Sequence, residues 1–379
     1  MITNLQLKNF TAFTELAIDF SPGINIIIGE NGTGKTQLLK AILALSGPWA
    51  HGERASEQLA SKLCRLYLPL SEKVGGLRRS GSRREAMLSA SFDSGHEITA
   101  RFRGTDTQTT VTHAGRAGAA QAIFIPTKEV LSLARGLMSD QADQETIKLI
   151  FDDSYIDLAS LLFEKIERGL SKRIQEDPRL STIIPRITNL IGGKYTLKNG
   201  RICFQAGRYE ERIGQSVTNE ETAGQVFKNS KIQFTPSDSA LISSAMTAEG
   251  FRKIGMLQRL LSNGSLIPGT TGPLLWDEPE SNLNPKLMRD LVLALLELAR
   301  NGQQIILATH DYVLLKWFDL LIRKGKGDHV LFHRLYRDAD SCEILRESQS
   351  DYSIVARSAI SNTFAELYDE DVKRALGGD

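Results

Sequence analysis

The sequence predicts an α/β fold built around a buried sheet. Residues 24–28 are a short β-branched run, which is typical of a strand buried on both faces. A glycine-rich loop follows, and residues 37–45 then have the apolar spacing of a helix. Downstream, the apolar strands at 272–276 and 304–308 lie on either side of a helical pattern at 286–300. Strands that alternate with helices in this way are typical of an α/β core.

The composition is that of a globular protein, with 41% hydrophobic and 24% charged residues in a chain of 379. No apolar run is long enough to span a bilayer, and the start has no signal-peptide pattern, so we expect a cytoplasmic protein with no membrane partner. The net charge of +1 gives no overall attraction to nucleic acid. Three widely spaced cysteines argue against a zinc site or a disulfide framework.

The N-terminal third predicts an antiparallel β lobe. Residues 2–8 and 16–20 alternate apolar and polar side chains, as strands with one covered face do. Further short strands are expected at 66–70, 86–92, 98–102, 107–112 and 121–126. The segment 78–84 carries four arginines. A solvated turn explains this basic loop, and a nucleic-acid or partner contact is the alternative.

The rest of the chain completes a single predicted head over 1–379. Its parts are an N-terminal lobe (1–126), a mainly helical insertion with a β-hairpin (127–235), a C-terminal lobe (236–340) and a helical tail (341–379). Within the insertion we expect a helix at 156–174 and a hairpin at 195–204, where Asn199-Gly200 favours a type I′ turn.

The loop after residue 28 matches the phosphate-binding pattern G-x-x-x-x-G-K-[ST] between a strand and a helix. Glycines let backbone N–H groups approach the phosphates, the lysine supplies a charge to the β- and γ-phosphates, and the final hydroxyl can ligate Mg²⁺. We therefore expect ATP and Mg²⁺ as cofactors. The residues of the loop and the start of its helix are Gly29, Glu30, Asn31, Gly32, Thr33, Gly34, Lys35, Thr36 and Gln37.

Two further strand ends carry polar side chains of the expected chemistry. The strand at 272–276 leads into Asp277, which can hold Mg²⁺, and Glu278, which can polarise the attacking water. The next strand ends at His310, a candidate for contact with the γ-phosphate. The predicted catalytic set is therefore Glu278, His310 and Lys35, with Thr36 and Asp277 at the metal.

These three motifs, in this order, resemble an ABC-type ATPase head of the RecF/SMC branch. Residues 277–285 resemble its Walker B motif and D-loop, which places Asn282 near a nucleotide, and residues 7–13 resemble its first strands. The compact length and the segments 123–131 and 360–369 are similar to those of OLD-like AAA ATPases. The resemblance implies a P-loop NTPase core with an antiparallel β lobe and a helical insertion.

The sequence departs from the family pattern at two features, the ABC signature and the Q-loop. The best match to the ABC signature is the segment 247–253, which keeps Gly250 but lacks the serine in register. Its backbone N–H groups can face a γ-phosphate across a dimer, or it is simply a helix start. The family's Q-loop glutamine has no clear counterpart, because Gln121 precedes its strand while Thr127, Lys128 and Glu129 follow it.

The resemblance implies an ATP-hydrolysing switch that forms a homodimer or higher oligomer around ATP. It also implies a nuclease or toxin as effector partner in phage defence, because no nuclease motif of the Toprim or HNH kind follows His310. Two alternatives stay open. One is a RecF-type DNA repair ATPase that binds nucleic acid, and the other is a nucleotide-dependent scaffold with little turnover.

Overall fold

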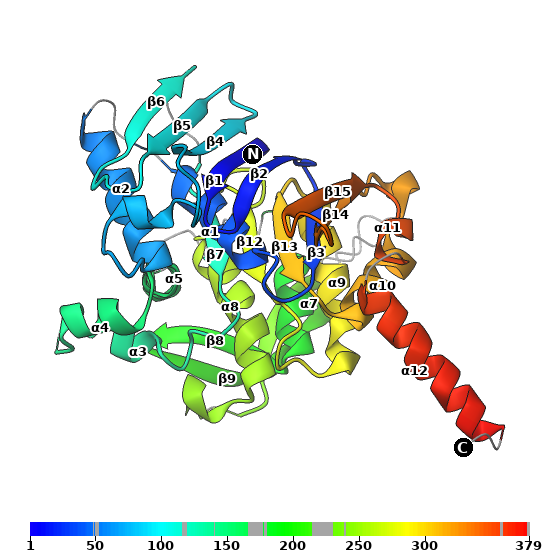
Figure 1. Cartoon of the computed structure of the whole chain (residues 1–379). Coiled ribbons are helices and arrows are strands. Elements are labelled where there is room, and N and C mark those ends of the chain that lie inside the picture. Colours follow the sequence, from blue (N-terminus) through cyan, green and yellow to red (C-terminus); the bar gives the residue numbers. More distant parts are fainter. Residues whose placement is uncertain are drawn as a thin grey trace.

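The buried run at 24–28 forms the middle of a six-stranded sheet in the computed structural model (Figure 1). The structure describes residues 1–47, 49, 53–115, 120–139, 141–165, 177, 180–213, 230–238, 240–356 and 359–376. The strand order of this sheet is β15-β14-β3-β13-β12-β7, and all neighbours pair in parallel except β14 and β15. Its strands are β3 (Ile24–Gly29), β7 (Ile123–Ile125), β12 (Leu274–Asp277), β13 (Ile305–Thr309), β14 (Val330–Arg337) and β15 (Ile344–Gln349).

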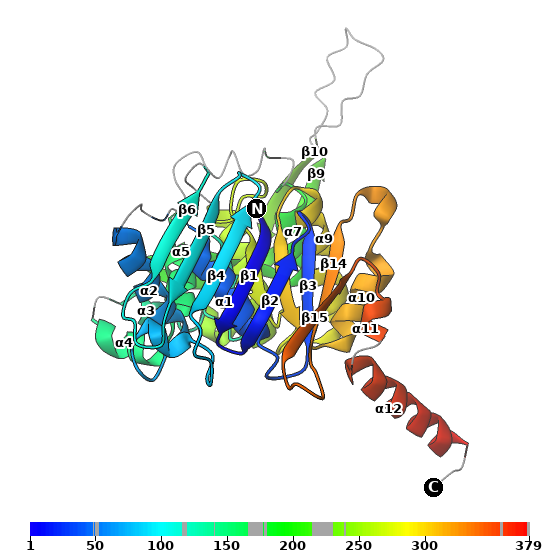
Figure 2. The same cartoon turned by 45° about the horizontal axis from the view of Figure 1, so that its top comes forward.

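The predicted antiparallel lobe is a second sheet, of order β2-β1-β4-β5-β6 (Figure 2). Alternating residues of its strands are buried, as the sequence pattern predicts. Its strands are β1 (Ile2–Phe10), β2 (Phe13–Asp19), β4 (Ala86–Phe92), β5 (Glu97–Phe102) and β6 (Thr110–Ala114). Helix α1 (Lys35–Leu45) contacts both sheets, and α2 (Glu53–Tyr67) packs beside it. One hydrophobic core therefore joins the lobe to the six-stranded sheet.

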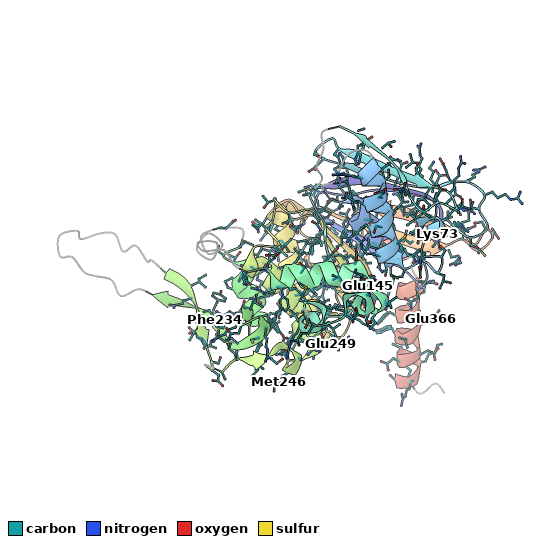
Figure 3. The ribbon with its side chains drawn as sticks, turned by 90° about the vertical axis from the view of Figure 1, so that its left-hand side faces the viewer. Lys73, Glu145, Phe234, Met246, Glu249 and Glu366 are labelled. Atoms are coloured by element: carbon teal, nitrogen blue, oxygen red, sulfur yellow. The ribbon has the colours of Figure 1, made fainter. Side chains whose placement is uncertain are left out.

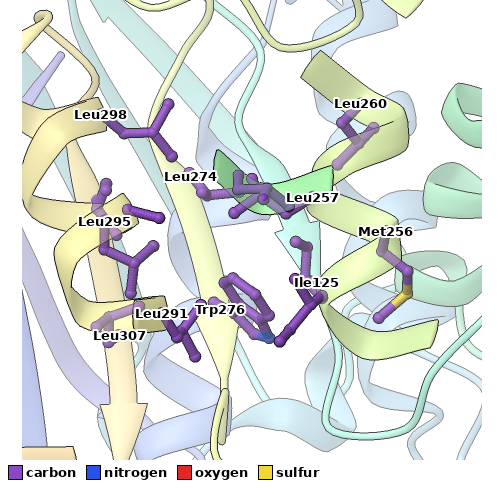
Figure 4. Close-up of a cluster of buried hydrophobic side chains, with 14 of the residues drawn as sticks. Ile125, Met256, Leu257, Leu260, Leu274, Trp276, Leu291, Leu295, Leu298 and Leu307 are labelled. Atoms are coloured by element: carbon purple, nitrogen blue, oxygen red, sulfur yellow. The ribbon is translucent and has the colours of Figure 1, made fainter. Parts of the chain in front are cut away.

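A layer of helices covers the other face of the parallel sheet and forms the second core. Figure 4 shows Trp276 of β12 between Leu257 of α8 and Leu291 of α9. Trp276 is fully buried, so this core fixes the strand that leads into Asp277 and Glu278. The helices outside the N-terminal lobe are α3 (Ala134–Leu137), α4 (Gln144–Ile150), α5 (Asp153–Phe163), α7 (Ile183–Leu190), α8 (Glu249–Asn263), α9 (Pro285–Arg300), α10 (Tyr312–Leu321), α11 (Ser353–Ala356) and α12 (Ala359–Ala375).

The expected hairpin in the insertion is present. It joins β8 (Gly193–Lys198) to β9 (Arg201–Ile213), and β9 also pairs with β10 (Ser230–Pro236) and β11 (Ile242–Ser243). Asn199 and Gly200 both have positive φ, 51° and 68°, as a type I′ turn requires.

Two expectations about secondary structure are wrong. Residues 66–70 do not form a strand, because α2 continues to Tyr67: its Leu59, Leu63 and Leu66 are buried on one helical face. The segment after residue 340 is not entirely helical, since β15 adds an antiparallel edge strand to the main sheet before α11 and α12. The helix expected at 156–174 is seen as α5 up to Phe163, and residues 166–174 lie outside the described part of the chain.

None of the helices in the described ranges is both long enough and apolar enough to cross a membrane. The boundaries of the four predicted parts of the head stay a prediction.

Candidate nucleotide-binding site

The parallel sheet brings the three motifs to one edge. The loop 29–36 begins at the last residue of β3, Asp277 ends β12 with Glu278 directly after it, and His310 follows β13. Because β12, β13 and β3 are parallel neighbours, their carboxyl ends lie side by side. Ligands of open α/β sheets bind outside such strand ends.

The glycines of the loop have conformations that side chains would oppose. Gly32 and Gly34 have φ of 82° and 88°. A Cβ at Gly34 would lie 2.6 Å from Cζ of Phe13, which belongs to the opening segment of the lobe. The loop is therefore shaped by its own glycines and by the lobe that packs on it.

Lys35 opens α1, and its side chain folds back over the loop. The ammonium donates to the carbonyl oxygens of Gly29, at 2.6 Å, and Glu30, at 3.1 Å. Burial lowers the pKa of Lys35, while the nearby carboxylates, Glu278 foremost, act in the opposite direction. The ammonium thus has only neutral carbonyl acceptors in this structure and is placed to exchange them for phosphate oxygens.

The other loop residues divide by exposure. Glu30, Asn31, Gly32 and Thr36 are exposed, whereas Thr33 is buried and its hydroxyl donates to the carbonyl of Glu30. The side-chain oxygen of Gln37 accepts a bond from the backbone N–H of Ala12, at 3.3 Å. Gln37 therefore fastens α1 to the β1–β2 turn.

Asp277 is the centre of a small polar cluster. Its Oδ2 accepts bonds from the hydroxyls of Thr36, at 2.7 Å, and Thr127, at 3.1 Å. Its Oδ1 is buried and has no hydrogen-bond partner. Burial raises the pKa of Asp277, and the two hydroxyls act against that rise.

A Mg²⁺ ion fits this cluster. A hydroxyl and one carboxylate with a buried, unpartnered oxygen are the hard oxygen groups that Mg²⁺ takes beside substrate phosphates. Among the described residues no group of three or more His, Cys, Asp or Glu side chains could hold a metal alone. Any such ion would therefore share its coordination with phosphate and water.

Glu278 and His310 face each other at the open side of the cluster. Nδ1 of His310 lies 3.0 Å from Oε1 of Glu278, and their side chains are 46% and 25% exposed. The backbone of Glu278 is in the left-handed region, with φ of 47°, which is uncommon for a residue with a side chain. This conformation turns the chain sharply at the end of β12 and leaves the carboxylate in contact with solvent.

Gly250 and Asn282 lie against each other. A Cβ at Gly250 would come within 2.7 Å of the carbonyl oxygen of Asn282, and the Asn282 amide donates to Glu249 at 2.8 Å. Gly250 thus has a packing role within the chain. The helix start itself is open: Ala248 is the N-cap, is exposed and makes no side-chain cap. Figure 3 shows Met246 and Glu249 together at the surface of this face.

Three site residues were missed by sequence reasoning about motifs. Thr127 was only one of several unassigned residues after β7, yet it binds Asp277. Glu280 is buried and accepts a bond from Thr309, and burial raises its pKa to about 7. Lys253 is buried beneath the site. Lys253 shares the buried side of α8 with Ile254 and Leu257, but the polar segment around Glu280 contains no signal of its burial.

Two family models match the chain. One, described as an AAA domain, matches residues 4–65. The other, described as "AAA domain, putative AbiEii toxin, Type IV TA system", matches residues 151–316. The first match includes the loop with Lys35, and the second includes Asp277, Glu278 and His310.

Curated relatives match only at one segment. The DNA replication and repair protein RecF of Limosilactobacillus fermentum is 42% identical over 59 residues, which are 16% of each chain. The RecF protein of Heliobacterium modesticaldum is 40% identical over 58 residues, 15% of this chain and 16% of its own. The match thus spans about a sixth of these relatives.

Solved SMC heads show a loose overall likeness. The head from Thermotoga maritima has a TM-score of 0.45 at 15% identity, over 91% of this chain and 98% of its own. An SMC head bound to the C-terminal winged-helix domain of ScpA has a TM-score of 0.49 at 16% identity, over 93% and 99%.

Proposed function

We propose that the chain is an ABC-type ATPase of the RecF/SMC branch and that it is a switch in which two copies close around ATP and hydrolysis opens them. The observation that carries this proposal is the position of Glu278. It lies next to Asp277 at the sheet edge that holds the Lys35 loop, it contacts His310, and it is open to solvent.

On this proposal the phosphates lie along the loop 29–36, where backbone N–H groups and the α1 N-terminus face them. Lys35 neutralises charge on the β- and γ-phosphates, and Thr36 and Asp277 hold Mg²⁺. The bound ion supplies charge stabilisation at the phosphates. Thr127 keeps Oδ2 of Asp277 in place through its hydroxyl.

Glu278 acts as the general base toward water, and His310 positions it. The protonated imidazole of His310 has two N–H donors, so Nδ1 can donate to Glu278 while Nε2 donates to an oxygen of the γ-phosphate. Glu278 is solvent-accessible, so the water that it polarises can reach it without passing through the core.

The second half of the site comes from another copy. The open N-terminus of α8, with Ala248 and Gly250, supplies N–H groups to the γ-phosphate of the partner chain, and Asn282 lies beside it in the D-loop. The γ-phosphate then joins the two chains, and its loss separates them. The proposed assembly is a homodimer or a higher oligomer built from such dimers.

We assign the switch to control of an effector, a nuclease or a toxin, in bacterial antiviral defence, as in OLD-like AAA ATPases. The family match over 151–316 supports this, since its description names a putative toxin of a toxin–antitoxin system. A cytoplasmic protein organised as one head with the four parts proposed above suits this role.

A second candidate is a DNA repair ATPase of the RecF kind. The 42% identity to RecF over 59 residues favours it, and Arg83 and Arg84 are exposed for contact with nucleic acid. It predicts that DNA stimulates turnover and that neutralising both arginines removes the stimulation. A scaffold with little turnover is the third candidate, and it predicts that Lys35→Ala changes no rate.

The test of the switch is the size of the protein with and without ATP. Glu278→Gln keeps the shape of the side chain but removes the base, so ATP binds and is not consumed. We expect an ATP-dependent dimer of this variant in size-exclusion chromatography with light scattering. Lys35→Ala is the control, because it removes the phosphate contact. An unchanged size for Glu278→Gln in saturating ATP rules out the sandwich.

A further inference from the structure

A buried lysine lies directly beneath the proposed catalytic carboxylate. Lys253 is on α8, one turn after its start, and its side chain is 1% exposed. The ammonium donates to the carbonyl oxygen of Thr127, at 2.8 Å, to the carbonyl oxygen of Glu278 and to the hydroxyl of Ser281. An ammonium has three donors, so these acceptors use all of them.

Each acceptor belongs to a different part of the site. Thr127 follows β7, and its hydroxyl binds Asp277. Glu278 directly follows β12, and Ser281 lies in the segment 277–285. Ser281 also donates to the carbonyl of Thr127, at 3.2 Å, and its N–H lies 3.1 Å from the carbonyl of Glu278. Lys253 therefore closes a network that joins α8 to the segments on both sides of Asp277.

The acceptors are two backbone carbonyls and a hydroxyl, and none of them is charged. Burial lowers the pKa of Lys253 to about 8, while the nearby carboxylates, Glu280 and Glu278 foremost, act in the opposite direction. Both the hydrogen bonds and the charge of Lys253 are therefore directed at the segments that carry the site.

The carbonyl of Glu278 is the most informative of the three contacts. Glu278 has a positive φ, a strained conformation for a residue with a side chain, and the ammonium holds the peptide group that follows it. A shift of α8 along its axis would therefore move the turn that aims the Glu278 carboxylate.

We infer that Lys253 is a positioning residue that couples the N-terminus of α8 to the catalytic carboxylate. When a partner chain closes on Ala248 and Gly250, it sets the position of α8. Lys253 moves with this helix and, through its hydrogen bonds, shifts Glu278, Thr127 and Ser281. This inference rests on the proposed two-copy ATPase switch and names how one copy senses the other.

Arg259 provides a matched control on the same helix. It is also buried, at 2% exposed, and it donates to the backbone carbonyls of Leu162, at 3.0 Å, and Glu164, at 2.7 Å. Lys253→Met and Arg259→Met therefore each remove a buried cation that binds backbone carbonyls. Only the first removes a contact with the site.

The experiment measures kcat and KM for ATP, and the affinity of a fluorescent ATP analogue, in both variants at temperatures where they are folded. We expect kcat of Lys253→Met to fall on the order of 10–100-fold, because small displacements of reacting groups cost that much. KM and analogue affinity should stay within about threefold, since Lys35 is untouched. Lys253→Arg, which keeps the charge and the donors, should recover part of kcat.

Equal kcat in Lys253→Met and Arg259→Met overturns the inference, as does an equal loss in Lys253→Arg and Lys253→Met. If Lys253→Met does not fold, Ser281→Ala tests the same network by removing one acceptor, and it should lower kcat without changing analogue affinity. Unchanged kcat in Ser281→Ala would then contradict the coupling. Failure of the proposed function is separate: turnover that survives Lys35→Ala refutes the ATPase assignment whatever Lys253 does.

Discussion

The loop at 29–36 and the start of α8 are both glycine-containing helix starts, but they differ in how completely the chain satisfies them. Lys35 and Thr36 already have partners within the chain, Gly29 and Glu30 for one and Asp277 for the other. Neither helix has a side-chain cap, but at the start of α8 Ala248 is exposed and has no side-chain group that could form a hydrogen bond. We therefore expect one chain to bind a nucleotide alone through the loop 29–36, and the start of α8 to bind a group from a second chain.

The largest expected effect concerns the half of the site that is formed by the loop 29–36 and Asp277. Asp277→Asn keeps the shape of the side chain but removes its charge, so Mg²⁺ and the hydroxyls of Thr36 and Thr127 lose a common anionic partner. We expect turnover to fall roughly 10–100-fold, because the loss of a group that supports a bound metal commonly costs that much in metal affinity or activity. The measurement is ATPase rate against Mg²⁺ concentration.

We expect Asp277→Asn to need more Mg²⁺ than the wild type. A high Mg²⁺ concentration should restore part of its turnover. A lower rate with an unchanged Mg²⁺ dependence would place Asp277 outside the metal site.

The next largest effect concerns the other half of the proposed site, the start of α8. Ala248→Asp adds a good N-cap, which stabilises a helix by about 0.5–2 kcal/mol, and also places a negative charge where a partner's γ-phosphate would lie. We expect thermal stability to be kept or raised while turnover falls roughly tenfold, a change of about 1.4 kcal/mol in the barrier. Melting temperature and kcat are measured on the same preparation.

Ala248→Ser is the matched variant, because it adds a cap without charge and restores the hydroxyl that the signature lacks. It should keep or raise turnover. An equal loss in both variants would mean that capping, and not charge at a phosphate, causes the effect.

The smallest effect concerns the buried carboxyl of Glu280, which follows Asp277 and Glu278 in the chain. Burial raises its pKa from 4.5 to about 7, so the folded protein holds this proton more tightly than the unfolded chain does. Between these two pH values the folded state binds more protons, and stability contributed by this group falls as pH rises. Glu280→Gln removes this titration.

The melting temperature of the wild type relative to Glu280→Gln should therefore drop by at least about 2 °C between pH 5 and pH 8. A constant difference across this range would contradict the buried, protonated carboxyl.

The same contrast explains what the sequence could predict. Gly29 to Thr36 form one continuous motif whose residues contact each other, so local pattern was sufficient for the loop, as it was for β12 with Asp277 and Glu278. Thr127 and Asp277 are 150 positions apart, and only the pairing of β7 with β12 brings them together. Lys253 depends in the same way on the packing of α8, which no short pattern encodes. Residues 66–70 were misread because Leu66 belongs equally to a strand pattern and to the helical stripe of α2.

Mixing two inactive variants tests the central claim, that each site is built from two chains, most directly. Lys35→Ala disables the loop, and Ala248→Asp disables the helix start. A dimer of one of each has one site with both defects and one intact site. If the variants assort randomly, about half of the dimers are mixed. The mixture should then recover about a quarter of wild-type turnover, although each variant alone is slow. Turnover no greater than the average of the separate variants would contradict the shared site.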